Sequence, residues 1–247
     1  MSERSRSFGR VADLYNRYRP GPPPALAERL GDLQSVRVLE IGAGTGLVSR
    51  FLLGLGADLV AVEPDPQMRA VLERESPGLT VIDAVAESLP LGDGSVALTV
   101  VSSAWHWFEQ PAATLELARV LVDGGRAFVM GNGFSESHQW FEDWSRIHNP
   151  GGGSWERRHA VDAGADLEVA FVDVESFEID WTWRRTLDEL MGMFATYSAV
   201  ITAPPDDRER MEREVRALIE AEAPSGVVDV PMRRVGSVGV RPPRPNV

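Results

Sequence analysis

A glycine-rich stretch, VLEIGAGTG at residues 38–46, carries the residue types with the clearest chemical meaning. Its three glycines alternate with other residues and are Gly42, Gly44 and Gly46. Glycines so spaced let a backbone turn tightly and approach a ligand without a Cβ in the way. A dinucleotide fingerprint would require glycine where the chain has Leu47, and acidic Glu40 suits a pyrophosphate poorly because like charges repel. The stretch therefore favours a ligand that has a cationic centre and no phosphate.

An acidic partner for this turn comes later in the chain. Glu63 lies 21 residues after Gly42, at the spacing where a carboxylate accepts hydrogen bonds from both hydroxyls of a ribose. The turn and the acid together indicate a nucleoside that carries a positive group. S-adenosylmethionine meets this description, because it has a ribose, a sulfonium and an ammonium. The alternative interpretation of the glycines is a tight turn between strand and helix with no ligand.

The segments around these residues alternate short apolar runs with helical stretches. Strands are expected at 36–41, 58–63, 79–83, 95–103 and 126–131, and helices at 46–55, 67–74 and 112–121. Strands that alternate with helices of about ten residues imply right-handed crossovers and a parallel, doubly wound sheet. The expected fold class is α/β, Rossmann-like and mostly parallel, and the carboxyl ends of its strands form the ligand crevice.

Further elements flank this core on both sides. Apolar residues at helical spacing predict a helix over 8–18 that ends before Pro20, within an N-terminal cap of residues 1–30. After the core, helices are expected at 136–148, 187–200 and 204–223, and strands at 167–183 and 227–232. The main domain would span residues 31–235, with lid insertions at about 132–165 and 184–223, and residues 236–247 would form a disordered tail.

Composition excludes several kinds of chemistry. All 25 basic residues are arginine, and the chain has no lysine and no cysteine. Schiff bases, the lysine of a phosphate-binding loop, thiol nucleophiles and thiolate metal sites are thereby excluded. The four histidines lack H-x-x-x-H spacing, so no metal is expected. A formal charge of −12 argues against nucleic acid or an anionic membrane as partner. No apolar run approaches the roughly 20 residues of a membrane helix, and a cytoplasmic monomer or homodimer is expected.

Five segments of the chain resemble the class I S-adenosylmethionine-dependent methyltransferases. They are VLEIGAGTG, AVEPDPQM (61–68), AVAESLPLGDGS (84–95), SSAWHWF (102–108) and ELARVLVDGGRAFVMG (116–131). The similarity covers about residues 8–232 and is greatest to the small-molecule, type 11 branch that includes trans-aconitate and ubiquinone-type methyltransferases. It implies a Rossmann-like fold, S-adenosyl-L-methionine as cofactor and methyl transfer to a small organic acceptor.

The resemblance also implies which residues hold the cofactor. Glu40 would assist near its amino group, and Glu63 would bind the ribose. Pro64 and Met68 would pack by the adenine, whose edge would meet the main-chain amide of Ala86. The complete expected set is Glu40, Gly42, Ala43, Gly44, Thr45, Gly46, Glu63, Pro64, Met68, Ala86, Glu87, Ser102 and Trp105.

The chain departs from the family pattern at three places. Many relatives carry aspartate where this chain has Val85. Asp83, two residues earlier, is not expected to replace it as an acceptor for the adenine amino group, and Glu87 is the remaining candidate. Pro22 replaces a tyrosine in the N-terminal YRPGPPPAL segment. Relatives continue a strand after Pro231, whereas this chain reads RRVGSVGVRPPRP, so the pairing of the last strand is open.

His106 is the candidate general base. Methyl transfer is an in-line displacement that depends mainly on positioning, and a base is needed only if the nucleophile must lose a proton. His106 lies in the loop after the fourth strand, and histidine titrates near neutral pH. Its alternative role is to orient the loop between Trp105 and Trp107.

Aromatic residues and one arginine are candidates to line the acceptor pocket. They are Tyr15, Tyr18, Arg19, Trp107, Trp140 and Tyr197. An aromatic pocket would suit a planar or cationic acceptor, and Arg19 would suit a carboxylate. Core packing of the tryptophans and a surface ion pair of Arg19 are the alternatives. Non-transfer chemistry on the bound sulfonium, or a non-catalytic cofactor-binding regulatory protein, also remains open from the sequence.

Overall fold

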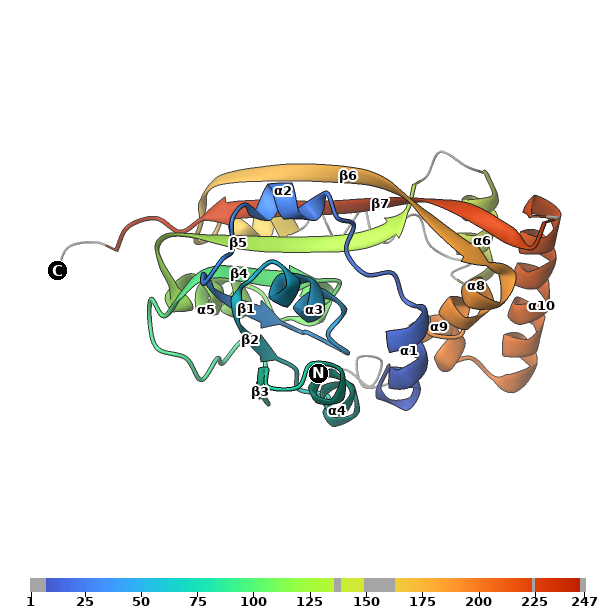
Figure 1. The fold of residues 1–247 in the computed structure, drawn as a ribbon, viewed down its shortest axis with the longest axis horizontal. Coiled ribbons are helices and arrows are strands. Elements are labelled where there is room, and N and C mark those ends of the chain that lie inside the picture. The colour runs from blue at the N-terminus through green and yellow to red at the C-terminus, as the bar shows by residue number, and fades with distance from the viewer. Residues whose placement is uncertain (1–7, 136–138, 149–162, 224, 245–247) are drawn as a thin grey trace.

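The computed structural model describes residues 8–135, 139–148, 163–223 and 225–244. A seven-stranded sheet with the order β3-β2-β1-β4-β5-β7-β6 runs through them (Figure 1). Its strands are β1 Arg37–Ile41, β2 Asp58–Val62, β3 Thr80–Ile82, β4 Val96–Ser102, β5 Leu121–Phe134, β6 Val172–Thr186 and β7 Val227–Val240. Pairing is parallel from β3 through β5, whereas β7 is antiparallel to both β5 and β6. The predicted α/β, mostly parallel Rossmann-like class is confirmed.

Helices follow the strands and cover both faces of the sheet. They are η1 Phe8–Val11, α1 Ala12–Tyr18, α2 Leu26–Leu30, α3 Leu47–Gly54, α4 Pro66–Glu75, η2 Trp105–Trp107, α5 Ala112–Val120, α6 Gln139–His148, α8 Leu187–Phe194, α9 Ser198–Ile201 and α10 Pro205–Glu222. Local signals fix several starts. Asp65 caps α4 by accepting from the amides of Gln67 and Met68, and Thr186 with Glu189 forms a capping box for α8. None of the helices in the described ranges is both long and apolar enough to cross a membrane.

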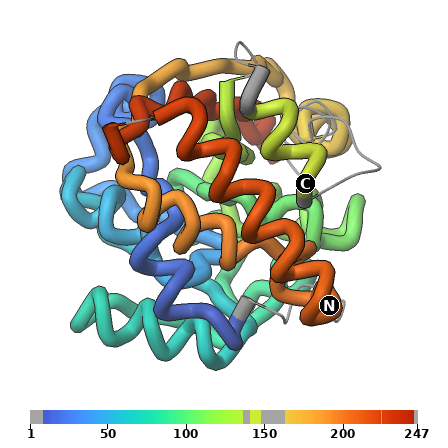
Figure 2. Tube along the Cα trace, turned by 90° about the vertical axis from the view of Figure 1, so that its right-hand side faces the viewer, coloured from blue at the N-terminus to red at the C-terminus, as the bar shows by residue number. Residues whose placement is uncertain are grey.

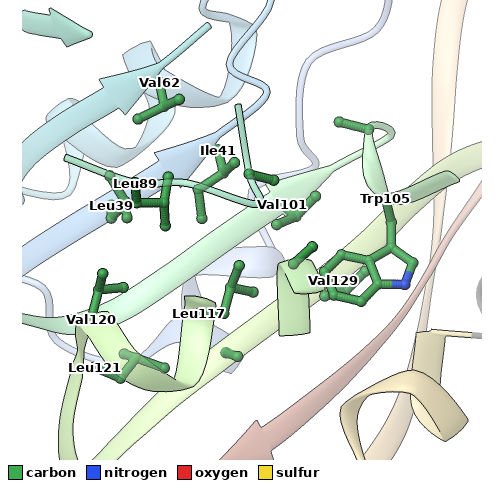
Figure 3. Packing of buried hydrophobic residues seen from close by; sticks show 14 of the residues in the cluster. Leu39, Ile41, Val62, Leu89, Val101, Trp105, Leu117, Val120, Leu121 and Val129 are labelled. Atoms are coloured by element: carbon green, nitrogen blue, oxygen red, sulfur yellow. The ribbon is translucent and has the colours of Figure 1, made fainter. Parts of the chain in front are cut away.

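Two hydrophobic layers lie on opposite faces of the parallel strands. Side chains alternate along β1, so that Val38 packs with the layer under α2 and α3, while Leu39 and Ile41 pack with the layer under α5. Figure 3 shows part of the second layer, in which Leu117 and Val120 of α5 lie near the strands. Burial on both faces explains why these strands read as continuous apolar runs.

The antiparallel strands β6 and β7 extend beyond the parallel part of the sheet and support a second helical layer. Figure 1 shows their far ends beside α6, α8 and α10. A separate hydrophobic cluster joins these elements and includes fully buried Trp144, with Phe194 of α8, Val215 of α10 and Val230 of β7. The helices of this layer therefore cover the carboxyl side of the sheet without disturbing the parallel core.

Several predicted boundaries are wrong, among them those of the strand expected at 126–131, which runs from Leu121 to Phe134 as β5. The helix expected at 187–200 divides into α8 and α9, because the chain turns at the buried Thr196, whose hydroxyl donates to the Met193 carbonyl. The strand expected from 167 begins at Val172, since residues 163–167 are helical. Residues 236–240, expected in a disordered tail, belong to β7.

Glycines explain why the end of β7 did not read as a strand. A Cβ on Gly236 would lie 2.6 Å from the Phe177 ring, and one on Gly239 would lie 2.8 Å from the Cβ of Phe171. Both glycines thus occupy positions where β6 and the chain before it approach too closely for a side chain. The end of β7 therefore lacks the alternation of large apolar residues that marks a buried strand, because Phe177 and Phe171 leave no room for side chains at the two glycines.

Candidate functional site

The glycine turn follows β1 and has the conformation that its glycines predicted. The backbone is left-handed at all three, with φ of +69° at Gly42, +58° at Gly44 and +83° at Gly46. A Cβ on Gly42 would lie 2.6 Å from the Cβ of Ala104, in the segment after β4. A Cβ on Gly46 would lie 2.3 Å from a methyl of Leu72 in α4. These glycines therefore allow β1, α4 and the segment after β4 to converge.

Glu63 lies beside this turn because β1 and β2 are parallel neighbours. It is the first residue after β2, and only 7% of it is exposed. The Gly44 amide donates to its Oε2 at 2.7 Å, and the Asp65 amide donates to its Oε1 at 2.9 Å. Burial raises the pKa of Glu63, while these two amide donors oppose the rise. The carboxylate is thus held in one orientation and keeps lone pairs for further donors.

Glu40 is a second buried carboxyl, on β1 just before the turn. It is 2% exposed, and the Ser49 hydroxyl donates to its Oε2 at 2.5 Å. Burial raises the pKa of Glu40 to about 8, and the negative charge of Glu63 adds to the rise. A cationic ligand group nearby would favour the ionised form of both carboxyls.

The high pKa of Glu40 makes stability depend on pH. The folded protein holds this proton up to about pH 8, whereas the unfolded chain releases it near pH 4.5. The stabilisation is therefore complete below about pH 4.5 and is lost as the pH rises through about 8. Between about pH 4.5 and 8, the unfolding free energy of the wild type should fall with a slope that approaches about 1.4 kcal/mol per pH unit because of Glu40. We expect Glu40→Gln, which mimics the neutral acid, to lack this contribution to the slope.

Urea unfolding of the cofactor-free protein at several pH values measures this slope. Glu28→Gln on the exposed surface of α2 is the matched control and should keep the wild-type slope. Equal slopes for the wild type and Glu40→Gln would contradict the buried proton.

The turn also fits a nucleoside in its remaining groups. Thr45 is 1% exposed, and its hydroxyl has no hydrogen-bond partner within the described structure. A Cβ on Gly44 would have a single neighbour within 4 Å among the described residues, the flexible terminal methyl of Met68 at 3.7 Å. An orphaned hydroxyl, an accessible glycine and the carboxylate of Glu63 form the donor and acceptor set that a ribose and a methionine tail require.

The residues expected around the adenine are more covered than the sequence suggested. Met68 is buried against Ala12 and Tyr15 of the N-terminal helix α1. Pro64 is half-buried, and Ala86 lies in the core layer under α5. The carboxylate of Glu87, half-buried, accepts from the Glu109 amide at 2.6 Å.

The acids at this edge are engaged within the protein. Asp83 accepts from Arg69 at 2.9 Å and is largely exposed. Arg69 also donates to the Glu63 carbonyl at 2.7 Å. Asp83 is thereby held at the surface of the protein by its ion pair with Arg69.

In the segment after β4, Trp105 is buried in the core, whereas the next residue, His106, is only half-buried. Trp105 packs in the core near Val129 (Figure 3), and its indole nitrogen donates to Asp166 at 2.8 Å. The half-buried ring of His106 lies 4.3 Å from the Trp107 ring, at an interplanar angle of 52°. Ser103 adopts a left-handed φ of +58°, which is rare for a residue with a Cβ and is a form of strain found at functional sites.

The expected acceptor residues of the N-terminal cap come together. Arg19 donates to the hydroxyl of Thr196 at 2.7 Å and to its carbonyl at 3.1 Å. Its guanidinium lies 5.2 Å from the ring centroid of Tyr15 and 4.2 Å from that of Tyr197. The Tyr18 ring packs where Gly192 of α8 has no side chain, since a Cβ there would approach within 2.5 Å.

Other aromatic residues are placed differently. Trp107 packs against the core layer under α5, on the segment that carries His106. The side chain of Trp140 lies outside the described residues. Among the described residues, the partners of the Arg19 guanidinium are Thr196 and two tyrosine rings.

Helix α1 connects the two halves of the site. It packs on α4 through Ala12 and Tyr15, and Asn16 accepts from Arg50 of α3 at 2.8 Å. Figure 2 shows α1, in blue, between α4 in teal and α8 in orange. The cap therefore packs on α4 beside the glycine turn and, through Tyr18, meets α8 of the helical layer.

Two functional candidates escaped the sequence interpretation. Arg234 on β7 is 1% exposed and donates to the Ser102 hydroxyl at 3.1 Å. Asn132 on β5 pairs with it directly across the two strands. The only local signal was the basic pair in PMRRVGSVGV, within the segment where strand pairing was left open.

Comparisons with known proteins agree with this geometry. The family model described as Methyltransferase domain matches residues 39–129. An uncharacterized methyltransferase of Mycobacterium tuberculosis is 34% identical over 215 residues, which is 87% of this chain and 86% of that protein. A solved structure from Anaeromyxobacter dehalogenans, provisionally assigned as a type II methyltransferase, has a TM-score of 0.65 at 24% identity and covers 92% of this chain and 100% of that one. Phosphoethanolamine N-methyltransferase 2 of Haemonchus contortus, solved with S-adenosyl-L-methionine, has a TM-score of 0.54 at 12% identity and covers 98% of this chain and 57% of that one.

The sheet order and the glycine turn define a class I methyltransferase fold, and the chain belongs to the methyltransferase family. The resemblance seen in the sequence is confirmed. The protein is an S-adenosylmethionine-dependent methyltransferase, and S-adenosylmethionine is its cofactor.

Proposed function

We propose that this enzyme transfers the methyl group of S-adenosylmethionine to a small organic acceptor that binds between the segment after β4 and the N-terminal cap. The carrying observation is the buried carboxylate of Glu63, held against the Gly44 amide at the carboxyl edge of the sheet. This position lies at the strand ends where open α/β sheets bind ligands. The acidic charge of the chain is compatible with a small molecule as partner.

In this proposal the glycine turn and the residues around it hold the cofactor. Glu63 accepts hydrogen bonds from the ribose, Glu40 offers negative charge to the cationic tail, and the orphaned hydroxyl of Thr45 gains a partner. The contributing residues would be Glu40, Gly42, Ala43, Gly44, Thr45, Gly46, Glu63, Pro64, Met68, Ala86, Glu87 and Ser102, with Trp105 contributing main-chain groups because its indole is committed to the core. When bound, the cofactor supplies a methyl group activated on a sulfonium.

The acceptor would be enclosed by the cap and the lid. Tyr15, Tyr18, Arg19 and Tyr197 form one wall of this space, within a cap of residues 1–30 and lid segments at about 132–165 and 184–223. Exclusion of water and fixed orientation of the acceptor are the main contributions such a wall can make to an in-line displacement. Trp107 would contribute from the opposite segment, beside His106.

His106 supplies a direct test of the chemistry. If it removes a proton from the acceptor, His106→Ala and His106→Asn should lower turnover by about 100-fold or more, the usual contribution of a general base. Calorimetric affinity for S-adenosylmethionine should stay within a factor of about two of the wild type, since the histidine would act on the acceptor. Unchanged turnover in both variants would eliminate the base and leave His106 as a support for Trp107.

Mass spectrometry with a methyl-labelled cofactor tests the proposal as a whole. Incubation of the enzyme with labelled S-adenosylmethionine and a panel of small molecules should give products that carry the label, together with S-adenosylhomocysteine. Products that form without the label would instead indicate rearrangement or cyclisation. Cofactor binding without any product from a broad panel would favour a regulatory role.

A further inference from the structure

Arg234 is the one residue of β7 whose charge is buried in the interior of the described structure without an acidic partner. It is 1% exposed, and burial lowers the pKa of its guanidinium to about 10, so it stays charged at neutral pH. Its Nη1 donates to the Ser102 hydroxyl at 3.1 Å, and its Nε has no hydrogen-bond partner. No carboxylate among the described residues forms an ion pair with it. A charge so placed costs several kcal/mol unless a counter-charge joins it.

The side chain of Asn132, next to Arg234, also contains buried polar atoms without hydrogen-bond partners in the described structure. Both polar atoms of its side chain, Oδ1 and Nδ2, are buried and have no partner within the described residues. Directly paired residues of antiparallel strands project to the same face, so Asn132 and Arg234 are side-chain neighbours. Leaving such groups unsatisfied costs about 1 to 3 kcal/mol each, and the usual reason is a ligand or a bound water.

The location of this pair is at the acceptor side of the site. Ser102 is the last residue of β4, and the segment that carries His106 follows it. Tyr15 of the cap is close enough to influence the pKa of Arg234, and the same tyrosine ring lies 5.2 Å from the Arg19 guanidinium. β7 is three strands from β1, roughly 14 Å at the usual strand spacing of about 4.8 Å, and so lies away from the glycine turn.

We propose that Arg234, together with Asn132 and Ser102, binds an anionic group of the acceptor, a carboxylate or a phosphate. The proposal rests on the function proposed above and narrows its substrate class. Arg234 offers Nε and its remaining guanidinium protons to the anion, and the Asn132 amide donates a further hydrogen bond. Arg19, whose guanidinium lies 5.2 Å from the Tyr15 ring, adds a second positive charge. The acceptor then presents its nucleophilic atom toward the segment that carries His106.

A binding experiment that does not depend on turnover tests this assignment. The protein saturated with S-adenosylhomocysteine is titrated with benzoate, phenyl phosphate and benzamide, and the melting temperature is followed. We expect the melting temperature to rise with the logarithm of the concentration of at least one of the two anions. Neutral benzamide should bind at least about tenfold more weakly than that anion, because hydrogen bonds to a charged group are worth about 1.5 to 3 kcal/mol. The anion that acts identifies the group. If neither anion acts, or benzamide acts equally, the proposal is overturned.

Three variants assign the effect to the residues named. Arg234→Gln should abolish the response to the anion. Arg233→Gln is the matched control, because it removes the same charge from the neighbouring half-buried arginine, which pairs with Asp180 at 2.6 Å, and it should keep the response. Asn132→Asp places a counter-charge beside Arg234 and should raise the melting temperature without ligand while removing the response. A response that survives in both Arg234→Gln and Asn132→Asp would overturn the site.

The cofactor also carries a carboxylate, on its amino-acid tail. A further experiment distinguishes binding of this carboxylate from binding of the acceptor's anionic group. Affinity for S-adenosylhomocysteine should change less than about threefold in Arg234→Gln, as should affinity for 5′-methylthioadenosine, which lacks the amino-acid tail. A selective loss for S-adenosylhomocysteine would assign Arg234 to the cofactor and overturn the proposal. If the anion binds as expected while no labelled product forms from any acceptor, methyl transfer fails and the anion site stands.

Discussion

Replacing Glu63 with alanine is expected to weaken S-adenosylmethionine binding by about 100-fold or more. Each hydrogen bond from a ribose hydroxyl to a buried carboxylate is worth about 1.5 to 3 kcal/mol, and two such bonds exceed the roughly 2.8 kcal/mol of a hundredfold change. The variant also removes the acceptor that holds the Gly44 amide, so the turn loses its support. Isothermal titration calorimetry measures the affinity directly.

The control for Glu63 is Asp83, a carboxylate at the same edge of the sheet. Asp83→Asn removes a charge that is exposed and paired with Arg69, so cofactor affinity should change by less than about threefold. Glu63→Gln keeps the shape of the side chain but sets its amide group against at least one amide donor, and its affinity should lie between those of the wild type and Glu63→Ala. A loss smaller than about fivefold in Glu63→Ala, with the fold intact, would show that Glu63 does not bind the ribose.

Gly42→Ala is expected to destabilise the protein by about 2 to 5 kcal/mol and to abolish measurable cofactor binding. The left-handed backbone costs an L-residue about 1 to 2 kcal/mol, and overpacking adds about 1 to 3. The added methyl would lie 2.6 Å from the Cβ of Ala104, and the Phe108 ring would lie 3.5 Å away, so the segment after β4 must move. Chemical denaturation and calorimetry measure the two effects.

Gly78→Ala separates strain from crowding. Gly78 also has a left-handed φ, of +88°, but no atom of the described residues lies within 4 Å of an added Cβ. The Gly78→Ala variant should lose only about 1 kcal/mol of unfolding free energy and keep its affinity for the cofactor. Adding Ala104→Gly to Gly42→Ala removes the atom of closest contact and should restore part of both properties. If Gly42→Ala and Gly78→Ala behave alike, the close approach to Ala104 has no functional importance.

Local patterns were sufficient to predict the parallel half of the molecule. VRVLEI and DLVAVE read as buried strands because both faces of β1 and β2 are covered, and the turn after β1 is marked by glycines that need a positive φ. Glu63 was found by its distance from Gly42 along one crossover, which the fold keeps nearly constant.

The antiparallel half depends on contacts that no local pattern contains. Asn132 and Arg234 become neighbours only when β5 and β7 pair in register, and neither residue stands in a recognisable motif. Likewise, the position of Trp105 is set by Asp166, a residue far along the chain that accepts from its indole at the edge of the core. Residues such as these are found from tertiary structure, because their meaning comes from partners distant in sequence.

Helix α1 has a thermodynamic consequence for how the two ligands bind. It contacts Met68 beside the glycine turn and, through Tyr18, the helix α8 that flanks the proposed acceptor wall. A displacement of α1 that admits one molecule therefore alters the surroundings of the other. Thermodynamic linkage then requires the effect to be reciprocal. If the bound nucleoside changes the affinity for the acceptor by some factor, the bound acceptor changes the affinity for the nucleoside by the same factor.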